Sequence, residues 1–476
     1  MSEVSLVFSA KSWDRMELHL AEEGEAERMA FGYCSAASAS GKSRILVNHV
    51  DFPLDCEYAV QRTTGVVLGA AKAIPYLLKA TGSAAFLDAH SHPQSVLPWP
   101  SPIDDIAAVG QYRALQGPAP DALLVRVIVS ADGMVWAGYH EDVSGVQPIT
   151  RIDVLGPDGL RMIFPVNSAW EAHLPLATDE RTADALGDQV LSRLRGLTVG
   201  LIGVGGVGSM VARLLAGLVG RLVLVDGDDI APSNIPRVWY AQARSRGKKV
   251  ILARRVLRRA FPQCAVDAIA EFFPSGETES ELAAVDILLA CPDHNAVRVS
   301  ASRFAAAKML PLIEVGCGGK MIDGRLSALG HHVRLQVPGG PCLSCNGLDV
   351  TRLEDPSTTA MKRRLGYIDG AEDAGGELAP LTTRAAADAV DVFLRYCTGY
   401  SGKAPLHLYA DALNWKLMDL SDRYVRRAGC PICDRQDLSQ SSLQSAAFGG
   451  GIVGLGQSPS LLGQGCSRSP ACELPE

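Results

Sequence analysis

The stretch that decides the fold is Leu197–Leu218, LTVGLIGVGGVGSMVARLLAGL. It begins with an apolar, strand-sized run, passes through a cluster of glycines and ends in Ser209–Leu218, which has the composition of a helix. A second apolar run, Arg221–Val225, follows at once. Because strands that alternate with helices pair in parallel, this order predicts an α/β fold with a doubly wound, Rossmann-like sheet.

The glycine cluster has the spacing of a nucleotide-binding loop. Its members are Gly203, Gly205, Gly206 and Gly208. Glycines in such a loop let the backbone approach a pyrophosphate at the start of a helix, and Asp226, which follows the next strand, is placed to bind a ribose hydroxyl. The pattern does not distinguish NAD from ATP, and an ordinary tight turn between strand and helix is the alternative interpretation.

Polar residues beyond the second strand favour ATP. They are Asp228, Asn234, Arg237 and Lys249, and then Asp293, which follows the apolar run Val285–Ala290. Adenylyl transfer uses cations to neutralise a triphosphate and a carboxylate to hold Mg²⁺, whereas a dehydrogenase has no evident need for them here. We therefore expect a site for ATP and Mg²⁺.

Two Cys-x-x-Cys pairs give the strongest local signal in this half: Cys342 with Cys345, and Cys430 with Cys433. Four thiolates in two knuckles form a closed, tetrahedral zinc site of the structural kind. A redox role is disfavoured because neither pair opens a helix after a strand, and four unrelated thiols are the remaining alternative. The twelve cysteines do not form the dense framework of a short secreted protein, so we expect a reducing, cytoplasmic location.

The first half of the chain carries a second candidate metal site. His90 and His92 follow the apolar run Ala84–Ala89, and Asp104 lies at the start of the predicted helix Ile103–Gln116. Side chains two apart on a strand share a face, so three zinc ligands can converge and leave a fourth position for water. Surface histidines near a turn are the alternative interpretation.

Hydrolysis at such a zinc needs further groups. Zinc lowers the pKa of bound water to about 7, but a base must still carry the proton to the leaving group. Glu27, at the start of a predicted strand, is the candidate base, although Glu22, Glu23 and Glu25 lie close to it in the sequence. Ser101 is the candidate donor to a developing oxyanion.

Residues 1–165 resemble the JAMM (JAB/MPN) metalloprotease family, whose signature is an upstream Glu, then His-x-His-Pro, then Pro-Ser-x-x-Asp. The resemblance implies an α/β domain that cleaves isopeptide or peptide bonds at the C-terminus of ubiquitin-like proteins, or small-molecule analogues of that bond. It assigns zinc to His90, His92 and Asp104, the base to Glu27 and oxyanion support to Ser101.

The first half departs from that family pattern in one place. Eleven residues separate His92 from Asp104, where the family usually has ten. Either the loop around Trp99 carries an extra residue, or Asp105 is a decoy beside the true ligand.

Residues 179–436 resemble the ThiF/MoeB/ubiquitin-activating superfamily. The shared motifs are the glycine loop, Asp-x-Asp, Ser-Asn-x-x-Arg, a Lys, Asp-x-x-x-x-Arg and the two Cys-x-x-Cys pairs. The resemblance implies adenylation of a C-terminal carboxylate with ATP. It places Asp226 and Asp228 on the ribose, Asn234, Arg237 and Lys249 on the phosphates, and Asp293 on Mg²⁺.

Two further details come from this resemblance. Arg181 matches the arginine that each subunit of such dimers donates into its partner's site, so we expect a homodimer. Lys249 is preferred to Lys248 because it fits the family's Lys-x-x-x-Ala helix.

Members that pass their substrate to a thiol carry that cysteine in the crossover before the last helix. No cysteine lies between Asn346 and Tyr396. Cys317 and Cys397 are better suited to packing. We therefore expect adenylation without an internal thioester.

The chain thus divides into a JAB/MPN-like domain over residues 1–165, a linker over 166–178, the adenylation domain over 179–436 and a tail over 437–476. The tail is rich in Ser, Gly and Gln, and we expect it to be disordered. Patterns in the first domain predict strands at Met16–Leu20, Arg28–Tyr33, Leu123–Ser130 and Met134–Tyr139, and helices at Tyr58–Thr81 and Ile103–Gln116.

Composition limits the partners. A net charge of −7 gives no indication of nucleic-acid binding, and the eight basic residues of Arg244–Arg259 are interpreted as a solvated helix face beside the triphosphate. The sequence shows neither a signal peptide nor an apolar run of the about 20 residues that span a bilayer, so we expect no membrane partner. The expected partners are a ubiquitin-like protein or a sulfur carrier, with a conjugating enzyme as a further candidate.

The two halves together predict a fusion enzyme. It would adenylate the C-terminal carboxylate of a ubiquitin-like protein, and process or deconjugate that protein with a zinc peptidase. The first alternative is sulfur-carrier activation in cofactor biosynthesis. The second is a non-catalytic scaffold whose altered His-to-Asp spacing no longer binds zinc.

Overall fold

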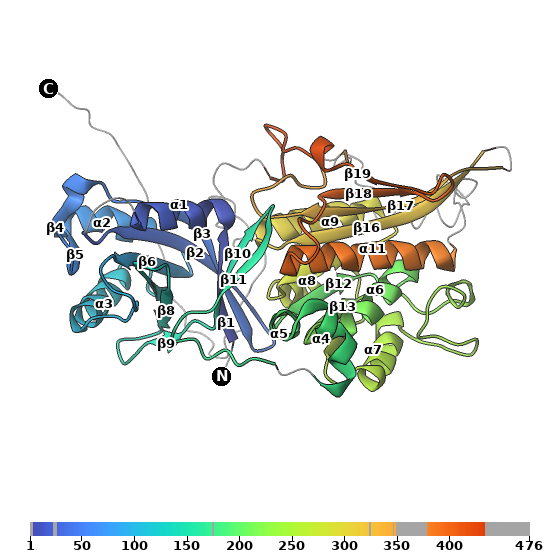
Figure 1. The fold of residues 1–476 in the computed structure, drawn as a ribbon, viewed down its shortest axis with the longest axis horizontal. Coiled ribbons are helices and arrows are strands. Elements are labelled where there is room, and N and C mark those ends of the chain that lie inside the picture. Colours follow the sequence, from blue (N-terminus) through green and yellow to red (C-terminus); the bar gives the residue numbers. More distant parts are fainter. Residues whose placement is uncertain are drawn as a thin grey trace, which may run out of the picture.

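A computed structural model describes residues 3–21, 26–173, 176–322, 325–345, 347–348 and 378–433. The predicted tail over 437–476 and the alternative acids Glu22, Glu23 and Glu25 lie outside these residues. Two lobes lie side by side, one built by the N-terminal part of the chain and one by the part after residue 176 (Figure 1). Within the described ranges, no helix combines the length and the apolar character needed to cross a membrane.

The second domain is built on an eight-stranded sheet with the order β14-β13-β12-β15-β16-β17-β18-β19. Its strands are β12 (Thr198–Ile202), β13 (Arg221–Val225), β14 (Ala265–Ile269), β15 (Ile287–Ala290), β16 (Leu312–Ile322), β17 (Arg325–Gln336), β18 (His407–Asp411) and β19 (Lys416–Asp419). The five strands from β14 to β16 run parallel, which confirms the predicted Rossmann-like arrangement. Strands β17 to β19 add an antiparallel extension that the prediction did not include.

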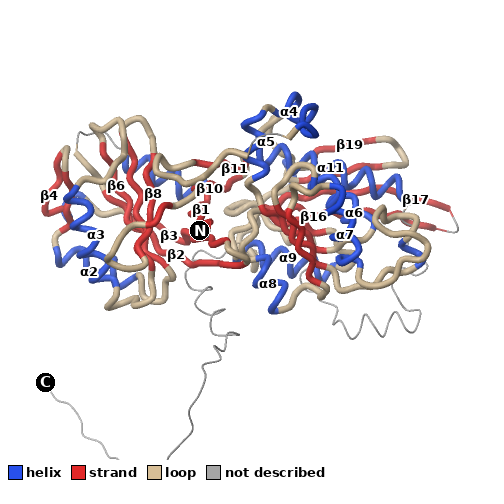
Figure 2. The backbone as a smooth tube through the Cα atoms, turned by 90° about the horizontal axis from the view of Figure 1, so that it is seen from below, coloured by secondary structure: helices blue, strands red, loops and turns tan. Residues whose placement is uncertain are grey.

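Helices cover both faces of this sheet (Figure 2). On one face, side chains of α6 (Gly206–Ala216), α7 (Lys249–Ala260) and α11 (Ala379–Thr398) share a core with the strands. On the other face, α8 (Gly276–Leu282) and α9 (Asn295–Ala307) form a second core. Two short helices precede β12: α4 (Glu180–Leu186) and α5 (Asp188–Arg195).

The first domain has a mixed sheet with the order β11-β10-β1-β3-β2-β6-β7-β8-β9. Its strands are β1 (Glu3–Ser9), β2 (Met29–Ala39), β3 (Lys42–Asp51), β6 (Ala85–His92), β7 (Leu123–Ser130), β8 (Val135–His140), β9 (Gln147–Pro148), β10 (Arg151–Gly156) and β11 (Gly159–Ile163), with a separate hairpin of β4 (Tyr58–Arg62) and β5 (Gly65–Leu68). Helix α1 (Ala10–Leu20) packs on one face, and α2 (Ala70–Lys79) and α3 (Pro102–Leu115) pack on the other. The predicted strands that correspond to β2, β7 and β8 and the predicted helix that corresponds to α3 are confirmed.

Two predicted elements of the first domain are wrong. Met16–Leu20, predicted as a strand, belongs to helix α1, whose buried face includes Trp13 while Leu18 is 72% exposed. Tyr58–Thr81, predicted as one helix, contains the β4–β5 hairpin before α2 begins at Ala70. The predicted linker over 166–178 packs onto the first domain where it is described, since the Asn167 side chain bonds both the N–H and the C=O of Ala137.

Buried charges join the two domains. Asp286, just before β15, accepts hydrogen bonds from Lys42 Nζ at 2.5 Å, from Arg151 Nη2 at 2.6 Å and from the Thr198 N–H at 2.7 Å. None of the three charged side chains is more than 5% exposed. Lys42 begins β3 and Arg151 begins β10, so the starts of the two strands on either side of β1 meet the second domain here.

Arg44 makes a second set of contacts across the junction. Its guanidinium donates to the carbonyls of Ala283, Lys308 and Met309 at 3.3, 3.1 and 3.1 Å. Ala283 caps the C-terminus of α8 and Lys308 caps that of α9. A cation of the first domain therefore satisfies the last carbonyls of two helices of the second, at the ends where the helix dipole favours positive charge.

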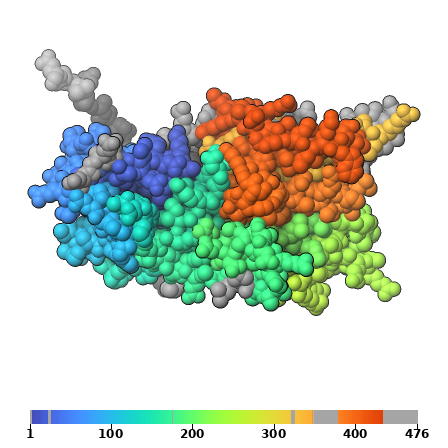
Figure 3. Space-filling view, in the orientation of Figure 1, coloured from blue at the N-terminus to red at the C-terminus, as the bar shows by residue number. Residues whose placement is uncertain are grey.

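The junction lies at the amino edge of the parallel strands. Thr198, Asp286 and Met309 lie at or just before the starts of β12, β15 and β16, and apolar side chains of β1, β3 and β10 pack on Met309. Residues of β11 (teal) also lie against those of α11 (orange) in the middle of the molecule (Figure 3). The carboxyl edge of the second sheet is consequently the edge away from the first domain.

Candidate functional site

The carboxyl edge of the second sheet has the crevice that a doubly wound fold provides. Strands β12 and β15 are neighbours. From β12, the strands β13 and β14 follow on one side and β15 and β16 on the other, so the switch point of the sheet lies between β12 and β15. Gly203 follows β12 and Cys291 follows β15, so the loops after both strands open on this switch point. Ligands of open α/β sheets bind at such a crevice.

Glycines are required in the loop after β12. Gly203 has φ +85°, and a Cβ there would lie 2.9 Å from the Cys291 carbonyl oxygen. A Cβ on Gly208, inside α6, would lie 1.9 Å from the Gly203 carbonyl oxygen. A Cβ on Gly205, by contrast, would meet no atom of another segment within 4 Å, so the side of the backbone that it would occupy, at the start of α6, is open to a phosphate.

The Asp226 carboxylate holds this loop in place. It accepts hydrogen bonds from the N–H of Val204 and from the N–H of Asp228, both at 2.9 Å. Burial raises the pKa of Asp226 above its usual value, while Lys249 acts in the opposite direction. The structure thus places Asp226 beside the glycine loop, as a residue on the ribose side would be, and also gives it a structural role that the sequence did not indicate.

The two neighbouring lysines point to different places. Lys249, which is 8% exposed, pairs with the Asp228 carboxylate at 2.8 Å. Lys248 is turned to the Gly227 carbonyl and to Asp229, at 2.8 and 3.2 Å. Of the two, it is Lys249 that lies beside the predicted ribose residues Asp226 and Asp228.

The segment after Asp228 covers the glycine loop. The Tyr240 hydroxyl donates to the Val204 carbonyl at 2.9 Å. The Asn234 side-chain oxygen accepts from the Ala231 N–H at 3.0 Å and so closes a short 3₁₀ turn, and the Arg237 N–H donates to the Asn234 carbonyl at 2.9 Å. Asn234 and Arg237, two of the three predicted phosphate contacts, therefore lie on one folded segment next to the loop.

Asp293 lies on the turn between β15 and α9, with its side chain 75% exposed. Arg298, on the first turn of α9, donates to the Pro292 carbonyl at 2.7 Å and so holds this turn. Arg181 is an exposed residue of α4. Its predicted role in a partner's site concerns a second chain and stays a prediction.

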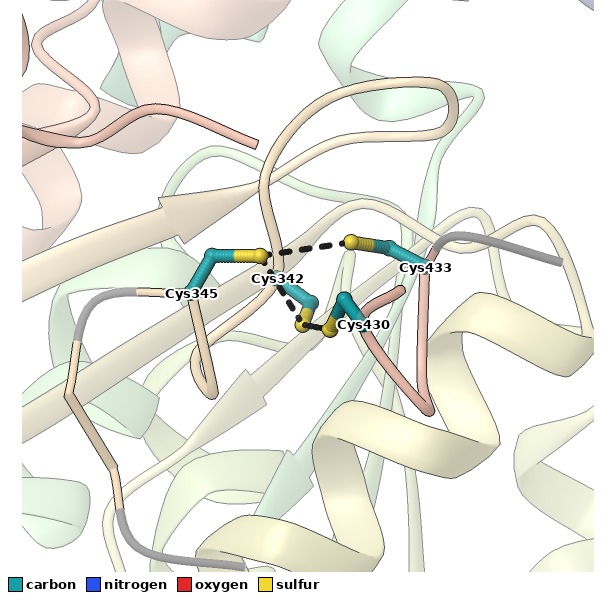
Figure 4. A group of neighbouring side chains, drawn as sticks. All are labelled: Cys342, Cys345, Cys430 and Cys433. Carbon is teal, nitrogen blue, oxygen red and sulfur yellow. Dashed lines mark hydrogen bonds between the residues drawn. The ribbon is translucent and has the colours of Figure 1, made fainter. Parts of the chain in front are cut away.

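The four predicted knuckle cysteines come together (Figure 4). The Sγ–Sγ distances are 3.5 Å for Cys342–Cys430, 3.4 Å for Cys345–Cys433 and 3.9 Å for Cys342–Cys345. Four sulfurs about 2.3 Å from a zinc ion lie about 3.8 Å apart in a tetrahedron, so this cluster can bind zinc.

Cys397 and Cys317 are not clustered with these four. Cys397, near the end of α11, is 8% exposed within the main core of the domain, and burial raises its pKa well above the usual value. Such a thiol is inert. Cys317 lies on β16, opposite His331 of β17.

In the first domain, His90, His92 and Asp104 converge. The Nε2 atoms of His90 and His92 lie 3.6 and 3.5 Å from the two Asp104 carboxylate oxygens. Ligand atoms about 2.1 Å from zinc lie about 3.4 Å apart in a tetrahedron, so the three fit one metal ion. His90 Nε2 is buried and has no hydrogen-bond partner among the described residues, as an atom kept for a metal would be.

The backbone of β6 and α3 sets this convergence. The two histidines occupy alternate positions at the end of β6, and the N–H of Ser101 donates to the Asp104 carboxylate at 2.6 Å while the Ser101 Oγ accepts from the Asp104 N–H at 3.2 Å. This capping box turns the carboxylate back toward the strand. Asp105 instead pairs with Arg126 at 2.9 Å, so the structure places Asp104, not its neighbour, at the histidines despite the longer loop.

Glu27 lies next to this triad. The Arg28 N–H donates to Ser91 Oγ at 3.0 Å, which fixes the start of β2 against the strand that carries the histidines. Burial raises the pKa of Glu27 above its usual value, while His90 and His92 act in the opposite direction. The side chain is 5% exposed, so a buried acid faces the candidate metal ligands.

One functional candidate was missed in the sequence. Glu314, which is fully buried in β16, forms an ion pair with Arg298. A single acid within the apolar run Leu310–Val315 was the available signal.

Comparison with known proteins places the second domain in a family. The model of the ThiF family matches residues 179–431, which is more than half of the chain. The adenylyltransferase and sulfurtransferase uba4 of Aspergillus niger is 29% identical over 255 residues, or 53% of this chain and 50% of that protein. Uba4 of Pyricularia oryzae is 31% identical over 188 residues, or 38% of each chain.

Two further proteins are similar to about half of this chain. Protein HesA, heterocyst, of Trichormus variabilis is 28% identical over 250 residues, or 52% of this chain and 84% of that protein. The E. coli MccB structure with MccA-N7isoASN has a TM-score of 0.45 and 19% identity, and the match covers 54% of this chain and 75% of that one. The chain spans half or less of the length of the fungal relatives named above.

Proposed function

Because the chain belongs to the ThiF family, we propose that its second domain activates a carboxylate with ATP. In this reaction a carboxylate oxygen bonds to the α-phosphorus, the bond from that phosphorus to the bridging oxygen breaks, and pyrophosphate leaves with the electron pair. The observation that carries the proposal is the crevice at the switch point, where the glycine loop and the Asp293 turn meet.

The residues of the crevice suit the parts of ATP. The open backbone at Gly205 and the start of α6 would receive phosphates, and Lys249 would exchange its partner Asp228 for a phosphate oxygen. Asn234 and Arg237 would add phosphate contacts. Asp293 would hold Mg²⁺, which neutralises charge on the phosphates when bound.

The substrate we propose is the C-terminal carboxylate of a ubiquitin-like protein. The buried Cys397 and the lack of cysteines from 346 to 396 in the sequence favour an adenylate that is used without an internal thioester. Activation of a sulfur carrier is the alternative within the same chemistry, and the name of the uba4 relatives, adenylyltransferase and sulfurtransferase, favours it. A homodimer with Arg181 exchanged between subunits, a conjugating enzyme as partner and a cytoplasmic location belong to the same proposal.

ATP–pyrophosphate exchange tests this function, with a ubiquitin-like protein ending in Gly-Gly as the carboxylate probe. Asp293→Ala should lower the exchange rate on the order of 100-fold, because the metal on the phosphates is lost. The matched control is Asp267→Asn, which changes a half-exposed carboxylate of the same domain in the middle of β14, paired with Arg221. ATP–pyrophosphate exchange that requires the ubiquitin-like protein but is unchanged in Asp293→Ala would contradict the proposal.

A second function is favoured by the metal triad of the first domain. We propose that His90, His92 and Asp104 bind zinc, that Glu27 is the general base and that Ser101 supports the oxyanion, as in a JAMM-type peptidase acting at the C-terminus of a ubiquitin-like protein. The zinc ion would supply an acidic bound water and polarise the scissile carbonyl. The domain bounds proposed are 1–165 and 179–436, with 166–178 between them.

Metal analysis and a cleavage assay separate this function from a scaffold. Two clusters predict two zinc ions per chain, of which a His90→Ala/His92→Ala variant should lose one. His49→Ala, a histidine with 44% side-chain exposure, is the control and should lose none. Glu27→Gln should keep both ions and lose cleavage of a C-terminally extended ubiquitin-like protein; zinc content that does not change in the double variant would favour the scaffold.

A further inference from the structure

A buried carboxylate stands behind the candidate Mg²⁺ site. Glu314 is 0% exposed and lies near the start of β16, in register with Ala290 at the end of β15. An ionised carboxylate in such a place is costly unless partners compensate it. Its partners therefore indicate what the residue is for.

Three cationic or basic side chains surround Glu314. Arg298 reaches it from α9, and Arg334, directly opposite on β17, approaches to 3.6 Å. His332 Nε2 lies 3.1 and 3.2 Å from the two carboxylate oxygens. Burial, and then Arg334 and Arg298, hold the pKa of His332 well below its usual value, so the positive charge comes from the guanidiniums.

Arg298 connects this cluster to the crevice. Its Nη1 faces Glu314, and its Nη2 donates to the Pro292 carbonyl at 2.7 Å. Pro292 precedes Asp293, whose carboxylate is 75% exposed. One guanidinium therefore joins a fixed, buried anion to the backbone of the turn that presents the candidate metal ligand.

We propose that Glu314 is a positioning residue for the adenylation site: it holds Arg298, and Arg298 holds the Cys291–Asp293 turn. This inference rests on the proposed role of Asp293. Without the Glu314 charge, Arg298 can turn toward Asp293 and pair with the carboxylate that Mg²⁺ needs. The loss is thus expected in metal-dependent nucleotide binding and not only in stability.

The test is calorimetric titration of the full-length chain with ATP, with and without Mg²⁺. In the wild type, Mg²⁺ should raise the affinity for ATP. In Glu314→Gln that gain should fall about tenfold, the low end of what outer-shell partners of a metal contribute. Asp293→Asn should abolish the gain, and adding Glu314→Gln to it should have no further effect, because both act through one site.

The matched control is Ser302→Ala. Ser302 is also fully buried on α9 and also bonds a side chain of β17, Gln336, at 2.6 Å, but it does not touch the turn. It should lower the thermal midpoint and keep the full gain from Mg²⁺. A Glu314→Gln chain that keeps the wild-type gain, or that loses no more of it than Ser302→Ala, overturns the positioning role.

Hydrogen exchange of residues 291–296 separates this inference from the proposed function. If the wild type binds no ATP, the proposed function fails, and amide exchange alone decides the positioning. Faster exchange in Glu314→Gln than in Ser302→Ala supports it. Equal exchange in the two variants overturns it.

Discussion

Replacing Asp286 by asparagine tests how strongly the junction stabilises the molecule. The change keeps the shape and the acceptor for the Thr198 N–H but removes the charge that faces Lys42 and Arg151. Breaking a buried ion pair costs about 3–5 kcal/mol, because the cation left behind stays desolvated. Arg151 retains Asp153 at 2.7 Å, so we expect the lower end, about 3 kcal/mol.

Urea unfolding at pH 7 measures this free energy. Lys42→Met should partly restore stability in the Asp286→Asn background, since it removes the orphaned cation, with a coupling of about 1–3 kcal/mol between the two changes. Asp267→Asn is the control: that carboxylate is 49% exposed and pairs with Arg221 at 2.6 Å, so its loss should cost less than about 1 kcal/mol. Equal losses in the two aspartate variants, or strict additivity with Lys42→Met, would refute the reasoning.

The same residue gives the junction a pH dependence. Burial alone would raise the pKa of Asp286, but Lys42 and Arg151 outweigh it and hold the pKa at about 2, below the 3.8 of a free side chain. The unfolded chain therefore takes the proton first. Stability from this group is complete above about pH 4 and is lost as the pH falls toward 2, and Asp286→Asn should lack that slope.

Three further predictions concern the second domain. Cys430→Ser should remove one zinc ion per chain by elemental analysis and lower the thermal midpoint; an unchanged metal content would contradict a zinc site at the four cysteines. Gly208→Ala should abolish ATP binding and lower the thermal midpoint, because the new Cβ meets the Gly203 carbonyl. Gly205→Ala should leave the thermal midpoint unchanged. Similar thermal midpoints in the two variants would show that the loop can relax. Burial lowers the pKa of His407 to about 4, so on acidification the unfolded state binds this proton first. Stability should therefore decrease as the pH is lowered from 6.5 to 4, and it should decrease less in His407→Asn. Urea midpoints that change equally with pH in both chains would contradict this.

Local patterns were sufficient for the parallel half of the second sheet. An apolar strand, a glycine loop and a helix follow one another in Leu197–Leu218, and the structure has them in that order as β12, the loop from Gly203 and α6. Patterns failed where two periods overlap. Met16, Leu18 and Leu20 alternate like a strand, but Trp13, Met16 and Leu20 also share one helix face, and the Ser9 cap on the helix decided between them.

Long-range contacts set the rest of the candidate sites. Asp286 lies 244 positions from Lys42 and 135 from Arg151, and no spacing in the sequence connects them. The role of Glu314 likewise depends on Arg334 lying opposite it in an antiparallel pair that the prediction of a parallel sheet did not include. Residues that belong to a short local motif, such as His90 and His92, could be proposed as site residues without long-range contacts.

The place of the junction limits what a single bound tail can touch. Glu27 and the candidate metal triad lie at the start of β2, the junction lies at its other end, and the candidate nucleotide crevice lies at the far edge of the second sheet. The 11 residues of β2 alone extend over about 33 Å. A polypeptide bound at both candidate sites of one chain at once would need at least about ten fully extended residues between its two contact points. A shorter tail has to leave one site before it can enter the other.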